Sequence, residues 1–388
     1  MLYYAAPMEG ITTYIYRRAH ARFYGGIDKY FTPFIAGKKM TTREVRDILP
    51  ENNAGVALVP QILTNKADDF LEIAKRLASY GYDTVNLNLG CPSGTVTAKK
   101  RGAGFLGEPE SLDAFLYEIY EKCPLQISIK TRLGISDLKE WERLLDIYAR
   151  YPVQELIVHT RLLQEFYTGA PHPEAFAMAL CRLRDTAGES ARSAGTALCY
   201  NGDILSAESL SDIQASVAAW IHDPGQRDEN NKNNRTGEAA HTALGTPVMD
   251  RIMIGRGLLR DPALARQLQA GCLPDAASQT ASPDPSGTGQ AASDCHHGSQ
   301  EAETLRAFHD VILNDYREIM SGDLPVLFKM KDLWTYMITA FTTSAPAQSP
   351  EAPDKRTVEK HLKKIRKADR IPEYQIAVDG LFRECFVR

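Results

Sequence analysis

The pattern that decides the fold lies in residues 56–87, which read VALVPQILTNKADDFLEIAKRLASYGYDTVNL. Two short apolar runs, Val56–Ile62 and Thr84–Leu87, stand at its ends, and both are bounded by turn or polar residues. Between them four apolar residues fall on one face of a helix: Phe70, Ile73, Ala74 and Leu77. Gly81 stands where a C′ residue would end that helix. The segment therefore predicts a strand, a helix and a second strand.

The same alternation extends over most of the chain. Six further apolar runs are predicted strands: Tyr3–Ala6, Tyr30–Ile35, Leu125–Ile129, Glu155–Val158, Ala197–Tyr200 and Arg251–Ile254. Helical patterns lie at 111–121, 137–150, 207–219 and 262–269, the last opened by Asp261 and Pro262. Strands alternating with helices in this number are typical of a (β/α)8 TIM barrel, whose functional residues collect at the carboxyl ends of the strands. A doubly wound open sheet has the same periodicity and is the alternative.

Polar segments divide the chain into domains. The segment 222–246 is a predicted insert within the barrel, and 271–302 is a predicted flexible linker. Beyond 303 five residues share a helical face: Leu305, Phe308, Val311, Ile312 and Tyr316. A further helix is predicted at 356–368, after a loop at 342–354 that contains three prolines. We therefore expect a TIM-barrel domain over 1–270 and a small all-helical domain over 303–388.

Composition limits the class of protein. With 388 residues, of which 44% are hydrophobic and 24% charged, the chain can bury a barrel and a smaller domain. Its net charge of -4 and pI of about 6.2 mean that any surface for nucleic acid must be a local basic patch. There is no long apolar run and no leader-like start, so we expect a cytoplasmic protein without membrane contact. The seven cysteines form no CxxC pair, which argues against a zinc or disulfide framework. We expect no metal site and a monomer.

Cys91 is the candidate catalytic residue. It lies in Asn86-Leu-Asn-Leu-Gly-Cys-Pro-Ser93, directly after the fourth predicted strand, and Arg101-Gly-Ala-Gly104 follows. A thiol with an ordinary pKa near 8.5 is mostly protonated at neutral pH and can donate a proton to a carbanion-like carbon. A buried structural cysteine is the alternative interpretation of this residue taken alone.

Two polar residues end consecutive predicted strands. Lys130 follows Gln126-Ile-Ser-Ile129, and His159 follows Val158. A lysine rarely ends an apolar strand unless its charge is needed in the barrel mouth, for example beside an anionic cofactor. A lysine reaching out to solvent and a hydrogen-bonded core histidine are the alternatives. Their shared position predicts one common site.

Phosphate binding is predicted at the loops after the last two strands, where barrels often hold this group. These loops contain Asn201-Gly202-Asp203 and Gly255-Arg256-Gly257, and Arg256 supplies a positive charge. A simple turn is the alternative for the second loop. Ala6-Pro7-Met8-Glu9-Gly10 after the first strand and Gln61 in the third are predicted to line the ring of a cofactor, since Gln61 offers both a donor and an acceptor.

Taken together, these residues resemble the tRNA-dihydrouridine synthase family. The matching elements occur in the family's order over about residues 1–265: Ala6–Gly10, Pro60-Gln61, Asn88–Pro92, Arg101–Gly104, Lys130–Arg132, His159–Arg161, Asn201–Asp203 and Gly255-Arg256. The most specific part is Asn-x-Gly-Cys-Pro followed by Arg-Gly-Ala-Gly. The polar segments 222–246 and 271–302 depart from what we expect of the family.

The resemblance implies a role for each matching residue. Contacts to FMN are implied for Pro7, Met8, Gln61, Lys130, His159, Asn201, Asp203, Gly255 and Arg256. Cys91 is implied as the general acid, Asn88 as a neighbour of the uracil, and Arg161 as a substrate-binding residue. In the implied reaction NADPH reduces FMN, a hydride passes to uracil C6, and Cys91 protonates C5. The uridine must leave its stack to reach the site.

The resemblance also implies tRNA binding by the C-terminal domain. Between Asp354 and Arg370 eight basic and three acidic residues leave a local charge of +5, which can meet phosphates. Lys99, Lys100 and Arg101 are predicted to extend the substrate surface around the barrel mouth. A solvated helix face is the alternative for the basic run. Two other functions stay open: an FMN barrel acting on a small pyrimidine or enone, and a non-enzymatic RNA-binding protein.

Overall fold

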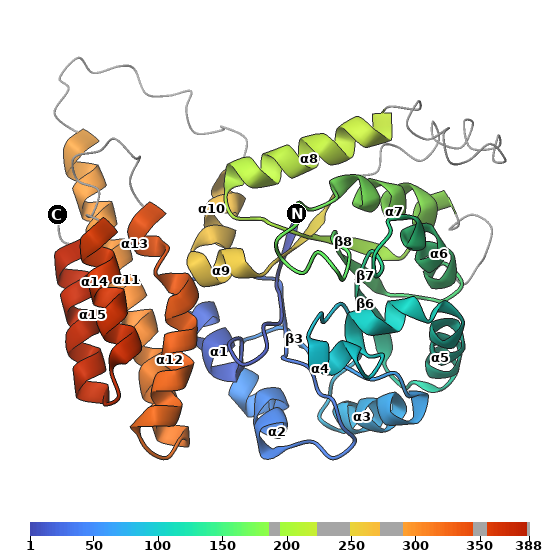
Figure 1. The fold of residues 1–388 in the computed structure, drawn as a ribbon, viewed down its shortest axis with the longest axis horizontal. Helices are drawn as coiled ribbons and strands as arrows, with labels where there is room; N and C mark the ends of the chain where they lie inside the picture. Colours follow the sequence, from blue (N-terminus) through green and yellow to red (C-terminus); the bar gives the residue numbers. More distant parts are fainter. Residues whose placement is uncertain (186–194, 223–248, 272–289, 344–354, 386–388) are drawn as a thin grey trace. The chain divides into compact units, whose positions relative to one another are not determined.

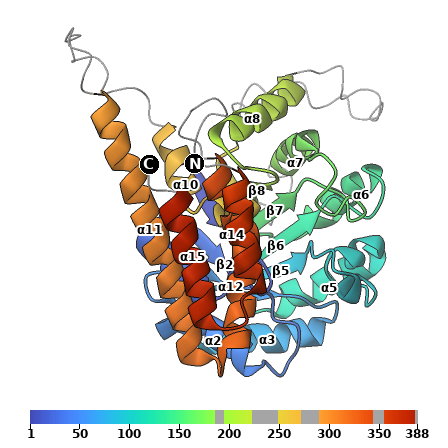
Figure 2. The same cartoon turned by 60° about the vertical axis from the view of Figure 1, so that its left-hand side comes forward.

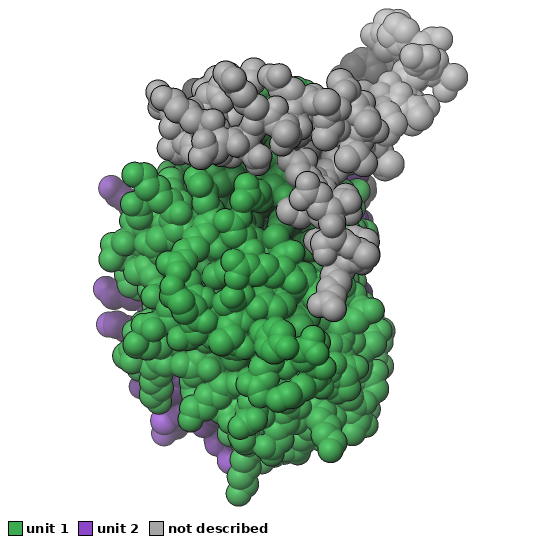
Figure 3. Space-filling model, turned by 90° about the vertical axis from the view of Figure 1, so that its right-hand side faces the viewer, with its two compact units in different colours: residues 1–9, 27–255 green, residues 10–26, 256–388 purple. Residues whose placement is uncertain are grey.

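The computed structural model describes residues 1–185, 195–222, 249–271, 290–343 and 355–385. They form two compact units, which Figure 3 shows in different colours. The first unit takes in residues 1–9 and 27–255, and the second takes in 10–26 and 256–388. Each unit has its own architecture.

The first unit is built on a parallel sheet of nine strands in the order β3-β2-β1-β9-β8-β7-β6-β5-β4. The strands are β1 (Leu2–Ala5), β2 (Lys29–Phe31), β3 (Leu58–Val59), β4 (Gln61–Ile62), β5 (Thr84–Leu89), β6 (Gln126–Arg132), β7 (Glu155–His159), β8 (Ala197–Asn201) and β9 (Arg251–Ile254). All of their pairings are parallel.

The sheet closes at Pro60. Strands β3 and β4 stand at opposite ends of the strand order, yet Pro60 is the single residue between them. Strand β3 pairs with β2, and β4 pairs with β5. Proline has no N–H to give to a ladder, so it interrupts the strand at this point. The result is an eight-stranded TIM barrel whose third strand changes partner at Pro60.

Helices lie outside the strands, as Figure 1 shows for α3, α5, α6 and α7. In this unit they are α2 (Thr42–Ile48), α3 (Ala67–Ser79), α4 (Gly94–Thr97), α5 (Pro109–Lys122), α6 (Lys139–Tyr148), α7 (Pro173–Asp185) and α8 (Ala207–His222), with short 3-10 helices η1 (Pro50–Asn53) and η2 (Gly102–Gly107). Phe70, Ile73, Ala74 and Leu77 are all buried on α3, as predicted. Gly81 follows this helix with a φ of +90°, a conformation that glycine adopts without strain.

The amino ends of the strands close one side of the barrel. Glu155 at the start of β7 is buried and accepts a hydrogen bond of 2.6 Å from Tyr4 Oη. Its carboxylate also lies 3.3 Å from Lys29 Nζ and 3.8 Å from Arg251 Nε. Above this cluster an apolar layer that includes Phe31 fills the interior. The carboxyl ends are therefore left for a site.

The second unit is helical. Its helices are α1 (Tyr14–Phe23), α9 (Arg256–Arg260), α10 (Leu264–Gly271), α11 (Gln290–Ile319), α12 (Asp323–Met337), α13 (Ala340–Thr343), α14 (Lys355–Lys367) and α15 (Ile371–Cys385). Helices α11, α12, α14 and α15 run side by side (Figure 2). A buried polar contact joins three of them, because Tyr374 Oη lies 2.6 Å from both His309 Nε2 and Trp334 Nε1.

The predicted TIM barrel and helical C-terminal region are confirmed. One boundary was wrong, because α11 begins at Gln290, inside the segment predicted to be a linker. Residues 10–26 and 256–271, predicted as barrel residues, cluster with the C-terminal helices. Most of the three predicted polar loops falls at 223–248, 272–289 and 344–354, outside the described residues.

Candidate active site

The loop that carries Cys91 is held by hydrogen bonds at both ends of this residue. Strand β5 ends at Leu89, and Asn88 Oδ1 accepts the backbone N–H groups of Gly90 at 3.0 Å and Cys91 at 2.9 Å. On the other side the carbonyl of Cys91 accepts the N–H of Ala103 at 3.1 Å. Cys91 therefore has a defined position at the carboxyl end of the barrel, as predicted for a residue that acts there.

The Arg-Gly-Ala-Gly motif packs directly against this loop. A Cβ atom on Gly102 would lie 2.8 Å from the carbonyl oxygen of Cys91, and Gly102 has a φ of +56°. A Cβ on Gly104 would lie 2.8 Å from the carbonyl oxygen of Thr97. Both glycines are needed for a close approach of two backbone segments, and Gly102 also for its left-handed conformation.

The surroundings of Cys91 favour the protonated form of its thiol. Burial raises the pKa of the Cys91 thiol, while the N–H of Ser93 and the positive charges of Arg132 and Lys130 offset part of this rise. A thiol whose pKa lies above its ordinary value is in the proton-donating form at neutral pH. The environment thus suits Cys91 to general acid chemistry better than to nucleophilic attack.

Lys130 lies beside Asn88 in the register of β5 and β6. It is half-buried, and burial together with the charge of Arg132 lowers the pKa of its amine to about 8. Within the described residues its amine has no hydrogen bond and no ion pair. Such an amine is suited to an anionic ligand, which would replace the lost hydration.

Gln61 and Asn88 are joined between the neighbouring strands β4 and β5. Asn88 Nδ2 donates to Gln61 Oε1 at 2.7 Å, and both side chains are buried. The structure thus brings together a residue predicted to contact the cofactor and one predicted to lie near the substrate. Gln61 Nε2 also donates to Asn86 Oδ1 at 2.8 Å. After these two bonds Asn88 keeps one N–H for a ligand, and Gln61 keeps one N–H and one lone pair.

Arg132 is a site residue to which the sequence assigned no role. It is fully buried, and its guanidinium donates to three backbone carbonyls. These are Gly90 at 3.0 Å, Leu162 at 2.9 Å and Phe166 at 2.9 Å. One side chain thereby holds the Cys91 loop to the loop that follows β7. It also lies over the ring of Tyr167, 5.2 Å from its centroid.

Arg161 and Asp203 form a two-bond ion pair. The Arg161 side chain is almost wholly buried and lies 3.2 and 2.5 Å from the two carboxylate oxygens. Its Nε also donates to the carbonyl of Gly169 at 2.6 Å. Both ends of the guanidinium fork are engaged within the protein, so its predicted role in substrate binding gains no support from the geometry. His159 Nε2 lies 3.5 Å from this guanidinium.

The predicted phosphate loops follow β8 and β9. Asn201 Nδ2 donates to the carbonyl of Met253 at 2.8 Å, which ties the ends of these strands together. The ring of Tyr200 packs on Gly202, so that a Cβ there would lie 2.8 Å from ring atoms. Gly255 is the last residue of the first unit, and Arg256 is the first residue of the longer segment of the second unit. Their predicted contact with phosphate stays a prediction.

The remaining predicted residues lie in loops of the first unit. Pro7 and Met8 are half-buried, whereas Glu9 is exposed and forms an ion pair with Arg43. Lys99 is exposed. Lys100 pairs with Glu108 at 2.5 Å, and Arg101 Nε lies 3.4 Å from Asn65 Oδ1. No group of three or more metal-ligating side chains occurs in the described part of the chain, and none of its helices is long and apolar enough to cross a membrane.

Comparison with known proteins shows which family the chain belongs to. Residues 4–219, more than half of the chain, match the family model for dihydrouridine synthase (Dus). The chain belongs to the dihydrouridine synthase family. The matched part of this family member contains the Cys91 loop, Lys130, His159 and the Arg161–Asp203 pair.

Relatives in the dihydrouridine synthase family are of modest identity. A protein of Staphylococcus epidermidis named "Probable tRNA-dihydrouridine synthase" is 28% identical over 261 residues, which cover 66% of this chain and 68% of that protein. One of the same name from Staphylococcus aureus is 26% identical over the same shares. The "Probable tRNA-dihydrouridine synthase 2" of Bacillus subtilis is 28% identical over 203 residues, 51% of this chain and 60% of that protein.

Proposed function

We propose that this protein is a tRNA-dihydrouridine synthase that reduces the 5,6 double bond of uridines in tRNA, with FMN as cofactor and NADPH as reductant. The observation that carries the proposal is the position of Cys91, on a loop held by Asn88 and Arg132 at the barrel mouth, where burial raises the pKa of its thiol. The proposal is supported by membership of the dihydrouridine synthase family and by relatives named for this activity.

The barrel mouth fits an anionic cofactor with a polar ring edge. Lys130 offers an amine that no described residue compensates, and Gln61 keeps a donor and an acceptor. FMN has both features, and we expect these two residues to hold it together with the predicted contacts at Pro7, Met8, His159, Asn201, Asp203, Gly255 and Arg256. When bound, FMN supplies the hydride for the reaction.

The residues of this chain orient the uracil and supply the proton. Reduction of the double bond adds a hydride at C6 and a proton at C5. The proton comes from Cys91 Sγ, which leaves a thiolate that solvent protonates again. The charges of Lys130 and Arg132 stabilise that thiolate. The N–H left free on Asn88 is available to a carbonyl oxygen of the uracil.

Replacement of Cys91 tests this role. We expect Cys91→Ala to retain FMN but to lose about 10²- to 10⁴-fold in single-turnover dihydrouridine formation, the usual contribution of a general acid. Cys123→Ala is the matched control, because this half-buried thiol ends α5 away from the site. Single-turnover reduction of tRNA at the unaltered rate by Cys91→Ala would remove the proton donor from the proposal.

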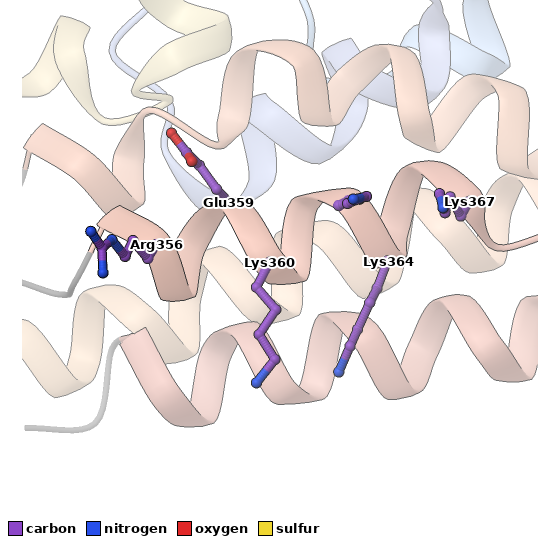
Figure 4. Close-up of a pocket in the computed structure, with 6 residues that line it drawn as sticks. Arg356, Glu359, Lys360, Lys364 and Lys367 are labelled. Atoms are coloured by element: carbon purple, nitrogen blue, oxygen red, sulfur yellow. The ribbon is translucent and has the colours of Figure 1, made fainter.

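We assign RNA binding to helix α14. Val358, His361 and Ile365 are buried on one face of it. Five of its exposed basic residues lie together: Arg356, Lys360, Lys363, Lys364 and Lys367. With Glu359 they line a depression of about 530 Å³ (Figure 4). The four lysines form no ion pair with a described residue, so their charges are available to phosphates.

Neutralising these charges tests the assignment. The triple variant Lys360→Gln, Lys364→Gln and Lys367→Gln is expected to weaken tRNA binding and to reduce the slope of log K against log salt by about 2 to 3, since each phosphate contact contributes slightly under one. The control changes three exposed lysines on other helices: Lys75, Lys122 and Lys139. An affinity and salt slope like those of the control would exclude α14 as the RNA surface.

A further inference from the structure

A line of buried side chains runs beneath the candidate site, from Gln61 on β4 through Asn86 on β5 to Ser128 on β6. Gln61 Nε2 donates to Asn86 Oδ1 at 2.8 Å, and Asn86 Nδ2 donates to Ser128 Oγ at 2.9 Å. Ser128 Oγ donates in turn to the carbonyl of Val85 at 3.3 Å. All three side chains are at most 1% exposed, so water does not replace these bonds.

Backbone groups at the two ends determine the direction of every bond in this line. At one end the N–H groups of Gly90 and Cys91 can only donate, so Asn88 must turn Oδ1 towards them. Its Nδ2 then faces Gln61, which must present Oε1. At the other end the carbonyl of Val85 can only accept. Each amide between these ends therefore has a single orientation that satisfies the line.

We propose that Asn86 and Ser128 are positioning residues of this site. They hold Gln61 on the side away from Asn88, so that Gln61 Oε1 stays on Asn88 Nδ2, and through Asn88 they support the backbone of Cys91. Neither residue reaches the reacting atoms. The inference concerns the site of the proposed function and depends on that function only where catalytic activity is measured.

The hydrogen bonds of this line explain why residues 86 and 128 are polar. A buried amide without its partner costs about 1–3 kcal/mol, whereas apolar side chains could fill this layer of a barrel at no such cost. Among the described residues, Asn86 and Ser128 form no hydrogen bond with a charged side chain. What they provide is the orientation of Gln61, and this orientation carries on to Asn88 and the Cys91 loop.

Alkylation of Cys91 tests the proposal without cofactor or RNA. The rate of iodoacetamide labelling is followed against pH by peptide mass spectrometry, with Cys123 of the same chain as reference. In Asn86→Leu, Gln61 loses its acceptor, so Asn88 loosens and Cys91 becomes more exposed. We expect the pKa of Cys91 to fall towards its ordinary value and its labelling at pH 7 to rise about three- to tenfold, the change in thiolate fraction for half to one pKa unit. Ser128→Ala should show the same effect, but smaller.

Two control variants separate positioning from general loosening. Asn86→Asp keeps the oxygen for Gln61 and loses only the N–H that Ser128 accepts, so labelling of Cys91 is expected to change no more than in Ser128→Ala. Thr131→Val removes a buried hydroxyl from β6, the strand that carries Ser128. Thr131 Oγ1 lies 3.0 Å from Tyr148 Oη of helix α6, away from the line, so this variant should not change the labelling rate of Cys91.

The labelling results separate the outcomes. The proposal is supported if labelling of Cys91 becomes faster in Asn86→Leu and Ser128→Ala while labelling of Cys123 does not change. It is overturned if the labelling rate of Cys91 in Asn86→Leu equals that in the unaltered protein, or if the labelling rates of Cys91 and Cys123 change by the same factor. An unaltered protein that fails to reduce tRNA would refute the proposed function and leave this result standing.

Discussion

Gly102→Ala is the change that most directly tests how the Cys91 loop is held. The new methyl group would meet the carbonyl oxygen of Cys91 at 2.8 Å, and both Cys91 Cβ and Val96 Cγ1 at 3.0 Å. Real Cβ atoms do not approach other atoms this closely, and the nearest contact is backbone rather than a flexible side chain. The Cys91 loop must therefore move away from the 3-10 helix η2.

The size of the effect follows from these distances. Carbon atoms pack best at about 3.5–4.0 Å, so the loop must shift by roughly 0.5 Å. A catalytic group needs to be placed within about 0.5 Å, and a displacement of 1 Å can cost about 10²-fold in rate. We therefore expect kcat for dihydrouridine formation to fall about tenfold. The φ of +56° adds a loss of about 1–2 kcal/mol in the free energy of unfolding.

Gly55→Ala is the matched control for backbone strain. Gly55 has a φ of +76°, but a Cβ there would meet no atom within 4 Å. Urea unfolding should show a similar loss of stability in both variants, while activity and the labelling rate of Cys91 should change in Gly102→Ala alone. If the two variants have the same activity, the close contact between Gly102 and Cys91 does not position the thiol.

Three further changes have expected outcomes. Lys130→Met should lower FMN retention in absorbance assays and yet raise the free energy of unfolding at pH 7 by about 1–2 kcal/mol, since it removes a half-buried charge. The pKa of Lys130 is about 8 in the folded protein and near 10.4 in the unfolded chain, so the unaltered protein should gain stability as the pH rises between these values. The difference in free energy of unfolding between Lys130→Met and the unaltered protein, measured with urea, should therefore narrow over this range. A difference that stays constant would contradict the lowered pKa. Asp203→Asn should destabilise the protein by about 3 kcal/mol or more, because it leaves Arg161 buried without its carboxylate, and a loss below 1 kcal/mol in the same unfolding assay would show that the pair is dispensable. Arg256→Ala should weaken FMN retention, and equal flavin affinity would count against the predicted phosphate contact.

The barrel could be predicted from the sequence because its strands and helices differ in period. The buried face of α3 was predicted correctly, with Phe70, Ile73, Ala74 and Leu77. The strand β9 was predicted with the bounds that it has in the structure, Arg251–Ile254. The division of the third strand at Pro60 was not predicted, because it depends on which neighbours pair with β3 and β4. Sequence periodicity carries no information on strand partners.

The site was predicted in part because its motifs stand at strand ends. Cys91, Lys130 and Gln61 were named as candidates and lie on or directly after β4, β5 and β6, but Arg132, Asn86 and Ser128 were not given roles. A signal for them existed: a polar residue stands at every second position, at Asn86 and Asn88 in one strand and at Ser128, Lys130 and Arg132 in the next. This period of two places the polar residues on one face of each strand. Their partners could not be predicted, because the hydrogen bonds cross between strands.

The ion pair of Arg161 with Asp203 shows a different limit of sequence reasoning, which does not identify partners distant in the sequence. Each was predicted to face a ligand, and each bears a charge that would suit this. In the structure they bind each other, at 2.5 Å between Arg161 Nη2 and Asp203 Oδ2. A pair of residues 42 positions apart comes together only through the pairing of β7 with β8, which neither local motif specifies.

The most direct test of the proposed function is the reaction itself. Purified protein loaded with FMN is incubated without oxygen with NADPH and an unmodified tRNA transcript, and the RNA is then digested to nucleosides and analysed by mass spectrometry. We predict dihydrouridine at defined positions of the tRNA, together with flavin absorbance that bleaches on addition of NADPH and returns on addition of tRNA. A flavin that NADPH reduces but tRNA does not reoxidise, with no dihydrouridine in the digest, would contradict the assignment.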